Sequence, residues 1–495
     1  MRGNSRVIQN QQQLLELANE FGSTSTLRRI FRKAFHLAND DLLIKKEKKF
    51  RCKVYNEEYK NAYQNYFARY EKTCTRLHFF TNTGSKITKN CYIGNCVLRP
   101  IKPASISYAV MPFQTVSGAD KYCLCTEKFV EKFNKKNFTV DAWPFIQQDG
   151  SFDRCAHVAL YSINQYLAKK GLAKKMNISQ IVKKAEDVPT LTREYPSEGL
   201  EILQIKYVLK EMGTFPIVYA YPSKAKEFDF PPQRIIYHYI ESGFPVLLGI
   251  KIGGTGHALV ALGHSFNPDS WLINVRKALF RTTAPANFYH CSTHWVDDFI
   301  ISDDNLGPYL SVDKNFFEAQ ANDKESGLVI VVALPKNVLV KGEDAEIYAF
   351  KTLSSNLRQE ISNLSEQSSS YYWFTHLMKH FEDNDIVLRT YLLKGQEIKQ
   401  RFYTQDFPTE FTDNIRKTPL PEYVWVTELS TPGIFAQSRK HLGTIVVDPT
   451  GDPLVSKNLL LIRHLPGILH CRNAKTDKMI EYVFEDDLPR RHLKR

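Results

Sequence analysis

A cysteine at the start of one amphipathic segment and a histidine in a glycine-rich turn about a hundred residues later could together perform nucleophilic chemistry. Cys155 is followed by apolar residues that recur mostly at intervals of three and four up to Leu167, a pattern typical of a half-buried helix. Gly150, Ser151 and Asp153 supply turn and N-cap residues upstream. Cys155 is therefore predicted in the first helical turn, where unpaired N–H groups and the helix dipole favour the thiolate, the reactive form of cysteine. The alternative is a buried structural cysteine.

The histidine is His257, which stands between two apolar runs of strand length. Phe244–Ile250 is the first run, a glycine-rich turn follows, and His257 opens the second run, which continues to Leu262. Two such runs joined by a tight turn predict an antiparallel hairpin with His257 near its rim. At that position the imidazole could act as a general base; the alternative is a hydrogen-bonded histidine of the turn.

A general base needs a third group that holds its other ring nitrogen. The next strand-like run, Phe299–Ser302, ends in Asp303 and Asp304, with Asn305 directly after them. Because side chains alternate faces along a strand, Asp303 and Asp304 point to opposite sides if the strand persists. Only one of them could then meet the His257 ring.

Two glutamines, Gln147 and Gln148, precede the cysteine. Either could place a side-chain N–H beside the backbone N–H of Cys155 and so form an oxyanion hole. Such a hole stabilises the negative charge that develops on a carbonyl oxygen under attack. The nucleophile, base and oxyanion donor together indicate cysteine-dependent acyl transfer.

The order of these motifs resembles the papain-like cysteine peptidases of the C39-like (bacteriocin-processing peptidase) type over residues 141–335. That family has a glutamine before a helix-opening Cys, a Gly-Leu segment, a Gly-x-Pro-Val strand, a Gly-His strand, and a strand ending in Asp shortly before a Gly. These motifs appear here as Gln147-Gln148 with Cys155, Gly199-Leu200, Gly243-Phe244-Pro245-Val246, Gly256-His257, and Asp303 with Gly307. The resemblance implies a catalytic triad of Cys155, His257 and Asp303, with Gln148 in the oxyanion hole.

Three positions depart from the family pattern. Ala156 follows the cysteine where the family usually has Gly, and Gln148 lies seven residues before the cysteine, one more than expected, so Gln147 stays open. Asp304 replaces the usual Pro after the orienting Asp. Counting back from the glycine at 307 selects Asp303 as the orienting acid, and leaves Asp304 to face solvent or to cap the turn.

The hydrophobic patterns predict an α+β protein of four parts. Residues 1–75 form a helix-rich N-terminal region, and 76–140 form a segment of short strands. Residues 141–335 form the papain-like domain, in which a helix packs on an antiparallel sheet. Residues 336–495 alternate helix and strand patterns and form a separate α/β domain of unknown role.

Composition narrows the class of protein without choosing a function. Of 495 residues, 43% are hydrophobic and 24% are charged, as in ordinary globular proteins. No apolar run reaches the roughly 18–20 residues of a membrane helix, and the first residues lack the apolar core of a secretory signal. We therefore expect no membrane partner and a cytoplasmic location.

The nine cysteines are dispersed, which fits reduced thiols better than a disulfide framework. Zinc ligands could come from Cys91 with Cys96, from Cys123 with Cys125, or from His290, Cys291 and His294, but no pair of CxxC units is present. We predict no metal and no cofactor.

The formal net charge of +13 raises the question of nucleic acid. The basic runs are dispersed and partly neutralised by acids, and no nucleic-acid module is recognisable, so we expect no nucleic-acid partner. A basic surface could equally recruit an acidic protein.

The sequence as a whole predicts a cysteine-dependent hydrolase, a peptidase that cleaves a peptide or isopeptide bond of a protein or peptide substrate through a thioester. A second hypothesis is a catalytically inactive papain-like scaffold that binds a protein partner. A third, less favoured, is a nucleic-acid-associated protein.

Overall fold

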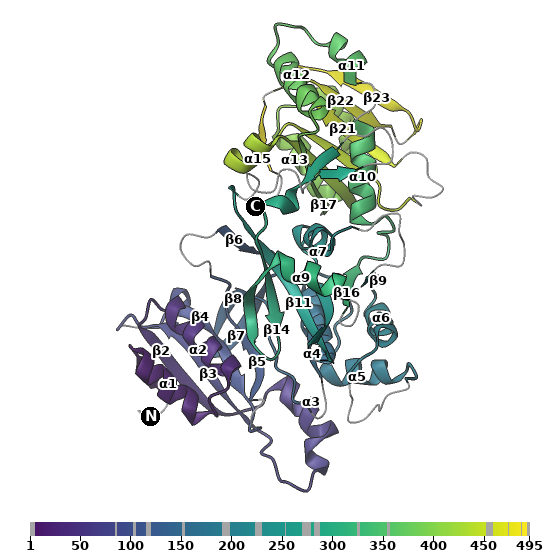
Figure 1. The fold of residues 1–495 in the computed structure, drawn as a ribbon. Helices are drawn as coiled ribbons and strands as arrows, with labels where there is room; N and C mark the ends of the chain where they lie inside the picture. The colour runs from purple at the N-terminus through teal and green to yellow at the C-terminus, as the bar shows by residue number, and fades with distance from the viewer. Residues whose placement is uncertain are drawn as a thin grey trace. The chain divides into compact units, whose positions relative to one another are not determined.

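The computed structural model describes residues 5–84, 87–101, 105–114, 120–150, 154–190, 199–222, 230–252, 254–269, 279–281, 288–323, 327–353, 357–451, 459–473, 475–486 and 488–492. The predicted mixed α+β class is confirmed (Figure 1). The chain forms two compact units: unit 1 comprises Met1–Lys224, Phe244–Gly263 and Phe299–Pro335, and unit 2 comprises Ala225–Gly243, His264–Asp298 and Lys336–Arg495. The segment 141–335 therefore contributes residues to both units.

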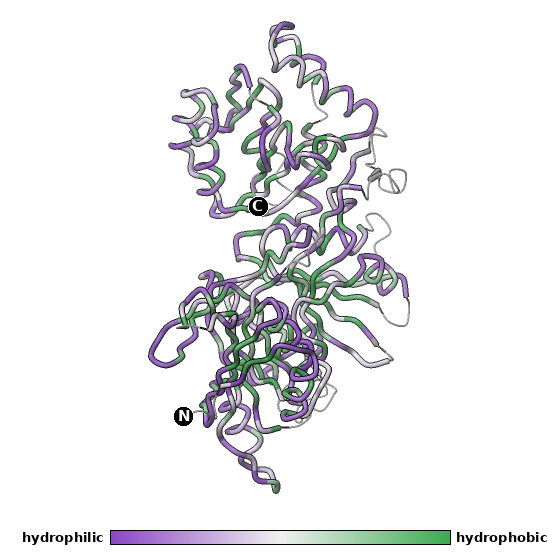
Figure 2. Tube along the Cα trace, turned by 90° about the vertical axis from the view of Figure 1, so that its left-hand side faces the viewer, coloured by the Kyte–Doolittle hydropathy of each residue, from purple (hydrophilic) through white to green (hydrophobic). Residues whose placement is uncertain are grey.

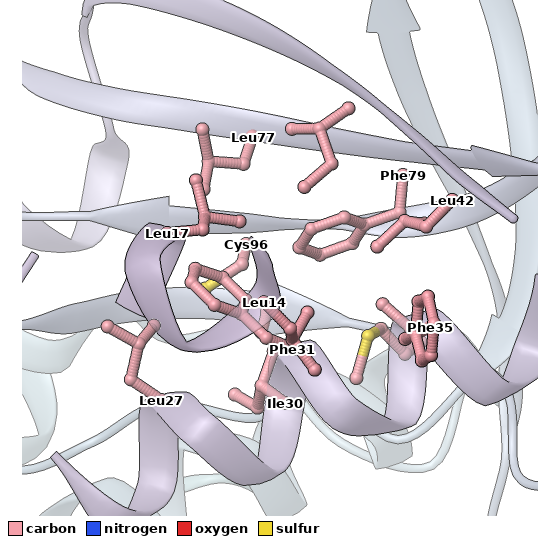
Figure 3. Packing of buried hydrophobic residues seen from close by; sticks show 14 of the residues in the cluster. Leu14, Leu17, Leu27, Ile30, Phe31, Phe35, Leu42, Leu77, Phe79 and Cys96 are labelled. Carbon is pink, nitrogen blue, oxygen red and sulfur yellow. The ribbon is translucent and has the colours of Figure 1, made fainter. Parts of the chain in front are cut away.

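The first part of unit 1 is a five-stranded antiparallel sheet covered by two helices. The strands, in sheet order, are β1 (Ser5–Ile8), β2 (Leu42–Phe50), β3 (Cys74–Thr81), β4 (Tyr92–Leu98) and β5 (Ile106–Val110). Helices α1 (Gln11–Glu20) and α2 (Ser25–Leu37) bury their apolar faces against this sheet (Figure 3). Phe31 of α2 meets Phe79 of β3 edge to face, with ring centroids 6.1 Å apart.

Local sequence explains why these elements form. The side chain of Asn10 accepts a hydrogen bond from the N–H of Gln13 at the start of α1, and Thr24 caps α2 in the same way. The region predicted as helix-rich, residues 1–75, also contains β2, because Leu42 and Ile44 are buried and alternate with more exposed residues.

A third helix and a hairpin complete this part of unit 1. Helix α3 (Lys53–Asn61) packs against α5 (Ile178–Glu186), and Tyr55 of α3 lies in a hydrophobic cluster with residues of β3, β4 and α5. Strands β7 (Glu127–Phe133) and β8 (Lys136–Ala142) pair with each other as an antiparallel hairpin.

The second sheet of unit 1 carries the candidate site. Its order is β15-β14-β11-β10-β16-β9, and β6 also pairs with β11. The strands are β6 (Asp120–Cys123), β9 (Phe215–Tyr221), β10 (Val246–Ile252), β11 (Thr255–Phe266), β14 (Asp298–Asp303), β15 (Gly307–Asp313) and β16 (Leu328–Leu334). β10 pairs antiparallel with β11, and Ile250 lies opposite His257, so the predicted hairpin is confirmed.

Helices α4 (Cys155–Lys169), α5 (Ile178–Glu186) and α6 (Ile202–Glu211) pack against one another, and α9 (Lys314–Asn322) packs against β15 and β16. The predicted helix start at Cys155 is confirmed. Gly171 lies just after the end of α4 with φ 73°, a left-handed conformation that commonly ends a helix.

Unit 2 contains an eight-stranded sheet of order β12-β13-β17-β18-β20-β21-β22-β23, in which the β13–β17 pair is parallel and the others are antiparallel. Its strands are β12 (Leu279–Arg281), β13 (Phe288–Cys291), β17 (Ile386–Lys394), β18 (Tyr423–Ser430), β20 (Gly443–Val447), β21 (Leu460–Leu465), β22 (Ile468–Arg472) and β23 (Met479–Val483), with a separate pair β19 (Lys440–His441) and β24 (Arg490–Arg491). Its helices are α7 (Pro232–Glu241), α10 (Gly342–Leu353), α11 (Leu357–Glu360), α12 (Ser369–Glu382), α13 (Gly395–Thr404), α14 (Thr409–Lys417) and α15 (Pro432–Ser438).

Hydrophobic stretches run through the strands of each unit, while many peripheral segments are hydrophilic (Figure 2). No helix in the described part of the chain is long and apolar enough to cross a membrane.

Candidate active site

Cys155 is the first residue of α4, and its side chain is only partly buried. The N-cap is Arg154, whose backbone N–H donates to Nδ1 of His157 over 3.3 Å. The N-cap was predicted among Gly150, Ser151 and Asp153; Gly150 takes φ 79°, as a turn glycine does, and the other two lie outside the described residues. The sulfur thus sits where the free N–H groups of a helix start favour negative charge.

His257 is the third residue of β11, and its ring lies between the cysteine and two carboxyl groups. The Cys155 sulfur and the His257 imidazole are hydrogen-bond partners, and this interaction raises the pKa of the ring. Nε2 of His257 lies 3.3 Å from Oδ1 of Asp303 and 3.9 Å from Oδ1 of Asp304. The structure therefore brings together Cys155, His257 and Asp303, from α4, β11 and β14 of unit 1 (Figure 1).

The placement of the two aspartates corrects the prediction that they point to opposite sides. Strand β14 ends at Asp303, and Asp304 begins a turn, so the alternation of a strand no longer applies to it. Asp304 is 6% exposed rather than facing solvent. The turn is capped by Asp303, whose Oδ1 accepts hydrogen bonds from the N–H groups of Asn305 (2.8 Å) and Leu306 (3.2 Å).

This arrangement polarises the imidazole. Burial alone would lower the pKa of His257, but its hydrogen bonds to Asp303 and Cys155 and the charges of both aspartates raise that pKa to about 10. Burial raises the pKa of Asp304 from 3.8 to about 7, although the His257 charge acts in the opposite direction. At neutral pH the site therefore favours the protonated, cationic form of the His257 ring.

The two glutamines have different surroundings. Gln147 is buried; its side-chain oxygen accepts from the N–H of Ile106 over 3.2 Å, and its side-chain nitrogen lies 3.5 Å from the hydroxyl of Thr26. Gln148 is partly exposed, and its Nε2 donates to Oδ1 of Asn305 over 3.3 Å. Gln148 therefore lies beside the turn that follows the aspartates, whereas the side chain of Gln147 is engaged with the first sheet.

A cavity of about 300 Å³ opens in front of Cys155 and His257. Its wall is mostly apolar, although Glu201 and Thr255 also line it; the larger apolar side chains are Leu200, Ile202, Ile205, Leu247, Ile250, Val329 and Val331. Gly256 also lines the cavity, and a Cβ at this position would meet no atom within 4 Å. The space in front of the sulfur can thus accept an apolar chain a few atoms across.

The sequence did not indicate that Asp304 would share the ring of His257 with Asp303. The sequence shows two consecutive acids at the end of a strand-like run. Where Asp304 points depends on the residue at which the strand stops, which the sequence does not show. Asn305 follows the two acids, and its side-chain oxygen accepts a hydrogen bond from the Gln148 amide.

Two groups of three side chains in the described part of the chain could approach a single metal ion. One is His257, Asp303 and Asp304 in unit 1; the other is His238, Cys291 and Glu346, buried in unit 2. Arg234 already forms an ion pair with Glu346 over 2.5 Å, so positive charge is present there without a metal. Of the zinc candidates named from the sequence, only Cys291 belongs to such a group among the described residues.

Comparisons with known proteins add little to this geometry. No family model matches the chain. No curated protein matches it either. Among solved structures, the chain has a likeness to the peptidase domain of Streptococcus ComA, described as a bi-functional ABC transporter involved in a quorum sensing pathway. The likeness covers 38% of this chain and 96% of that one, at 14% identity and a TM-score of 0.23. A likeness at that level carries no argument, so function is inferred from the site alone.

Proposed function

We propose that the protein is a cysteine peptidase that uses Cys155 as nucleophile and His257 as acid and base. The observation that carries the proposal is the Cys155–His257 hydrogen bond at a helix start, backed by Asp303 at 3.3 Å and open to an apolar cavity. A nucleophile, a base and an orienting acid in contact are the arrangement that acyl transfer through cysteine requires.

In the proposed reaction the Cys155 sulfur attacks the carbonyl carbon of a peptide or isopeptide bond. The oxygen becomes an anion next to the backbone N–H groups at the start of α4, with Gln148 as the candidate second donor. His257 gives its proton to the leaving amine, and a thioester remains on Cys155. His257 then takes a proton from water, which attacks the thioester and releases the acid.

Asp303 is assigned the orienting role, because its Oδ1 accepts hydrogen bonds from two backbone N–H groups and also lies 3.3 Å from Nε2 of His257. Asp304 adds a second acid to the same ring nitrogen. The apolar wall of the cavity supports a substrate with an apolar side chain near the cleaved bond.

The test compares cellular proteins after expression of the wild type, of Cys155→Ala and of Cys91→Ala, a partly exposed cysteine outside the site. Mass spectrometry of protein N-termini should reveal new termini with the wild type and with Cys91→Ala, and none of them with Cys155→Ala. If all three proteins give the same termini, the peptidase proposal fails, and a scaffold that binds without cleaving becomes the better hypothesis.

A further inference from the structure

A second cavity in unit 1 is separate from the candidate active site. Its volume is about 840 Å³, within the roughly 300–1,000 Å³ of small-molecule and cofactor sites. Its walls come from the start of α3, strands β3, β4, β5 and β7, and one face of α4 with the segment after it. Neither Cys155 nor His257 lines it. We call it the basic cavity.

Cationic side chains outnumber acids in the basic cavity. Five cations line it, Arg51, Lys53, Arg76, Lys169 and Lys175, against a single carboxylate, Glu131. Arg76 is already neutralised by ion pairs with Glu47 and Glu131, at 2.7 and 3.4 Å. Lys169 donates to the carbonyl oxygen of Lys128 over 2.8 Å.

Three of these cations make no ion pair with any described residue: Arg51, Lys53 and Lys175. Arg51 and Lys53 flank the start of α3, whose first N–H groups add positive potential. Lys175 approaches the same cavity from the chain that follows α4. Positive charge that the protein leaves unmatched around one cavity favours a ligand with more than one negative charge.

The wall between the cations is aromatic. Arg76 lies 4.0 Å from the ring centroid of Phe50, and Lys169 lies 4.7 Å from that of Phe129, so both rings already hold a cation. Tyr108 and Tyr161 also line the cavity, and neither stacks on another ring or cation of the described chain. Both tyrosines are partly buried against hydrophobic clusters, and the side of each ring that lines the cavity can take a flat ligand ring.

Cys52, at the N-cap position of α3, provides a reporter inside the basic cavity. A hydrogen bond from Cys74 and, among others, one from Ser107 lower the pKa of the Cys52 thiol to about 6, although burial opposes this. Cys52 is 5% exposed, and a lowered pKa favours the thiolate, the form that an alkylating agent attacks once it enters the cavity. A bound ligand would block that access.

We propose that the basic cavity binds a polyanionic small molecule with a flat ring, of the size and chemistry of a nucleotide. Its phosphate groups lie at Arg51, Lys53 and Lys175, and its ring lies against Tyr108 and Tyr161. The site is independent of the proposed peptidase activity, because it shares no residue with the cavity that Cys155 and His257 line.

Calorimetry on the full chain tests the affinity with three probes: ATP, inorganic tripolyphosphate and adenosine. ATP should bind best, and tripolyphosphate and adenosine should each bind at least about tenfold more weakly. The double variant R51E/K175E should weaken ATP binding by at least about tenfold, since two charge-assisted contacts are reversed. The control K48E/K183E makes the same change of net charge at exposed lysines outside the cavity and should bind ATP as the wild type does.

Absence of ATP binding, or an equal loss in both double variants, overturns the proposal. Equal affinity for ATP and tripolyphosphate overturns the assignment of the ring to Tyr108 and Tyr161. Location is tested by alkylation in the Cys155→Ala background, read by mass spectrometry of each cysteine peptide. Saturating ATP should slow labelling of Cys52 and leave Cys91 unchanged; ATP that binds without protecting Cys52 places the ligand elsewhere. These results do not depend on whether Cys155 cleaves a substrate.

Discussion

Three of the nine thiols are partly exposed, Cys91, Cys123 and Cys155. Of these three, Cys155 alone contacts a histidine paired with a carboxylate within the described part of the chain. Cys91 is an informative control, because a hydrogen bond from Thr88 lowers the pKa of its thiol without any imidazole. Comparing the alkylation rates of Cys91 and Cys155 therefore separates the effect of exposure from the effect of His257 on the reactivity of Cys155.

Under limiting iodoacetamide at pH 6–7, Cys155 should be alkylated faster than Cys123, and His257→Ala should slow Cys155 by about tenfold or more. The reason is that the variant removes the cation beside the sulfur. Alkylation of Cys91 should not change. Peptide-resolved mass spectrometry measures all three rates in one sample, and a His257→Ala variant that leaves the Cys155 rate unaltered would contradict the assigned pair.

The two aspartates beside His257 predict different responses. Asp303→Ala should reduce kcat by about 10²–10⁴-fold, because the imidazole loses the group that orients it.

Asp304→Asn should mainly change how the stability of the folded protein depends on pH. The folded-state pKa of Asp304, about 7, lies above its ordinary value of 3.8, so the folded state binds this proton more tightly than the unfolded state does. Stability from this group is therefore present at low pH and is lost as pH rises from about 4 to 7.

Asp304→Asn removes that loss, so the variant should gain melting temperature relative to the wild type between pH 4 and pH 8. Thermal melts across this range measure the difference. Asp141→Asn, at an exposed position on β8, is the matched control and should show no such trend. A constant difference between Asp304→Asn and the wild type at all pH values would mean that Asp304 is ionised alike in both states.

Strand β11 has two glycines whose surroundings differ sharply. A Cβ on Gly263 would collide with the carbonyl oxygen of Tyr122, where β6 pairs with β11, whereas a Cβ on Gly256 meets nothing within 4 Å. Both are in one strand, and neither has a φ in the left-handed region. Alanine at each of the two glycines restricts the chain similarly, but only alanine at Gly263 adds an atom to a tightly packed position. Comparing the two variants therefore isolates the effect of close packing.

Gly263→Ala should destabilise unit 1 by about 1–3 kcal/mol, the usual cost of adding atoms to a packed interior. Gly256→Ala should leave the melting temperature near that of the wild type. Thermal unfolding followed by circular dichroism compares the two. Equal melting temperatures for both variants would show that β6 moves aside at no cost and is not fixed against β11.

The elements that sequence predicts best are those with local signals. The helix from Cys155 and the hairpin around His257 follow from apolar periodicity and glycine turns, and the structure has both. The position of Asp304 could not be predicted, because it depends on the residue at which β14 stops pairing with its neighbour. The role of Gln147 was equally hidden, since its partner Ile106 is distant in the sequence.

At the scale of the whole molecule, the region 141–335 reads in the sequence as one continuous domain. In the structure, residues 225–243 and 264–298 belong to unit 2. One cause is the parallel pairing of β13 with β17, which joins segments about a hundred residues apart. No periodicity within either strand shows which strand it will pair with, so pairings of this kind escape analysis of sequence pattern.

Unit 1 is built from three separate stretches of the chain, so the ribosome makes its site residues at different times. Asp303 is added to the chain about 150 residues after Cys155. At roughly 5–20 residues per second on the ribosome, the Cys155 sulfur is made about seven to thirty seconds before the carboxylate of the proposed triad. During synthesis the chain therefore carries the proposed nucleophile without its partners, so we expect no self-cleavage until most of unit 1 has been made.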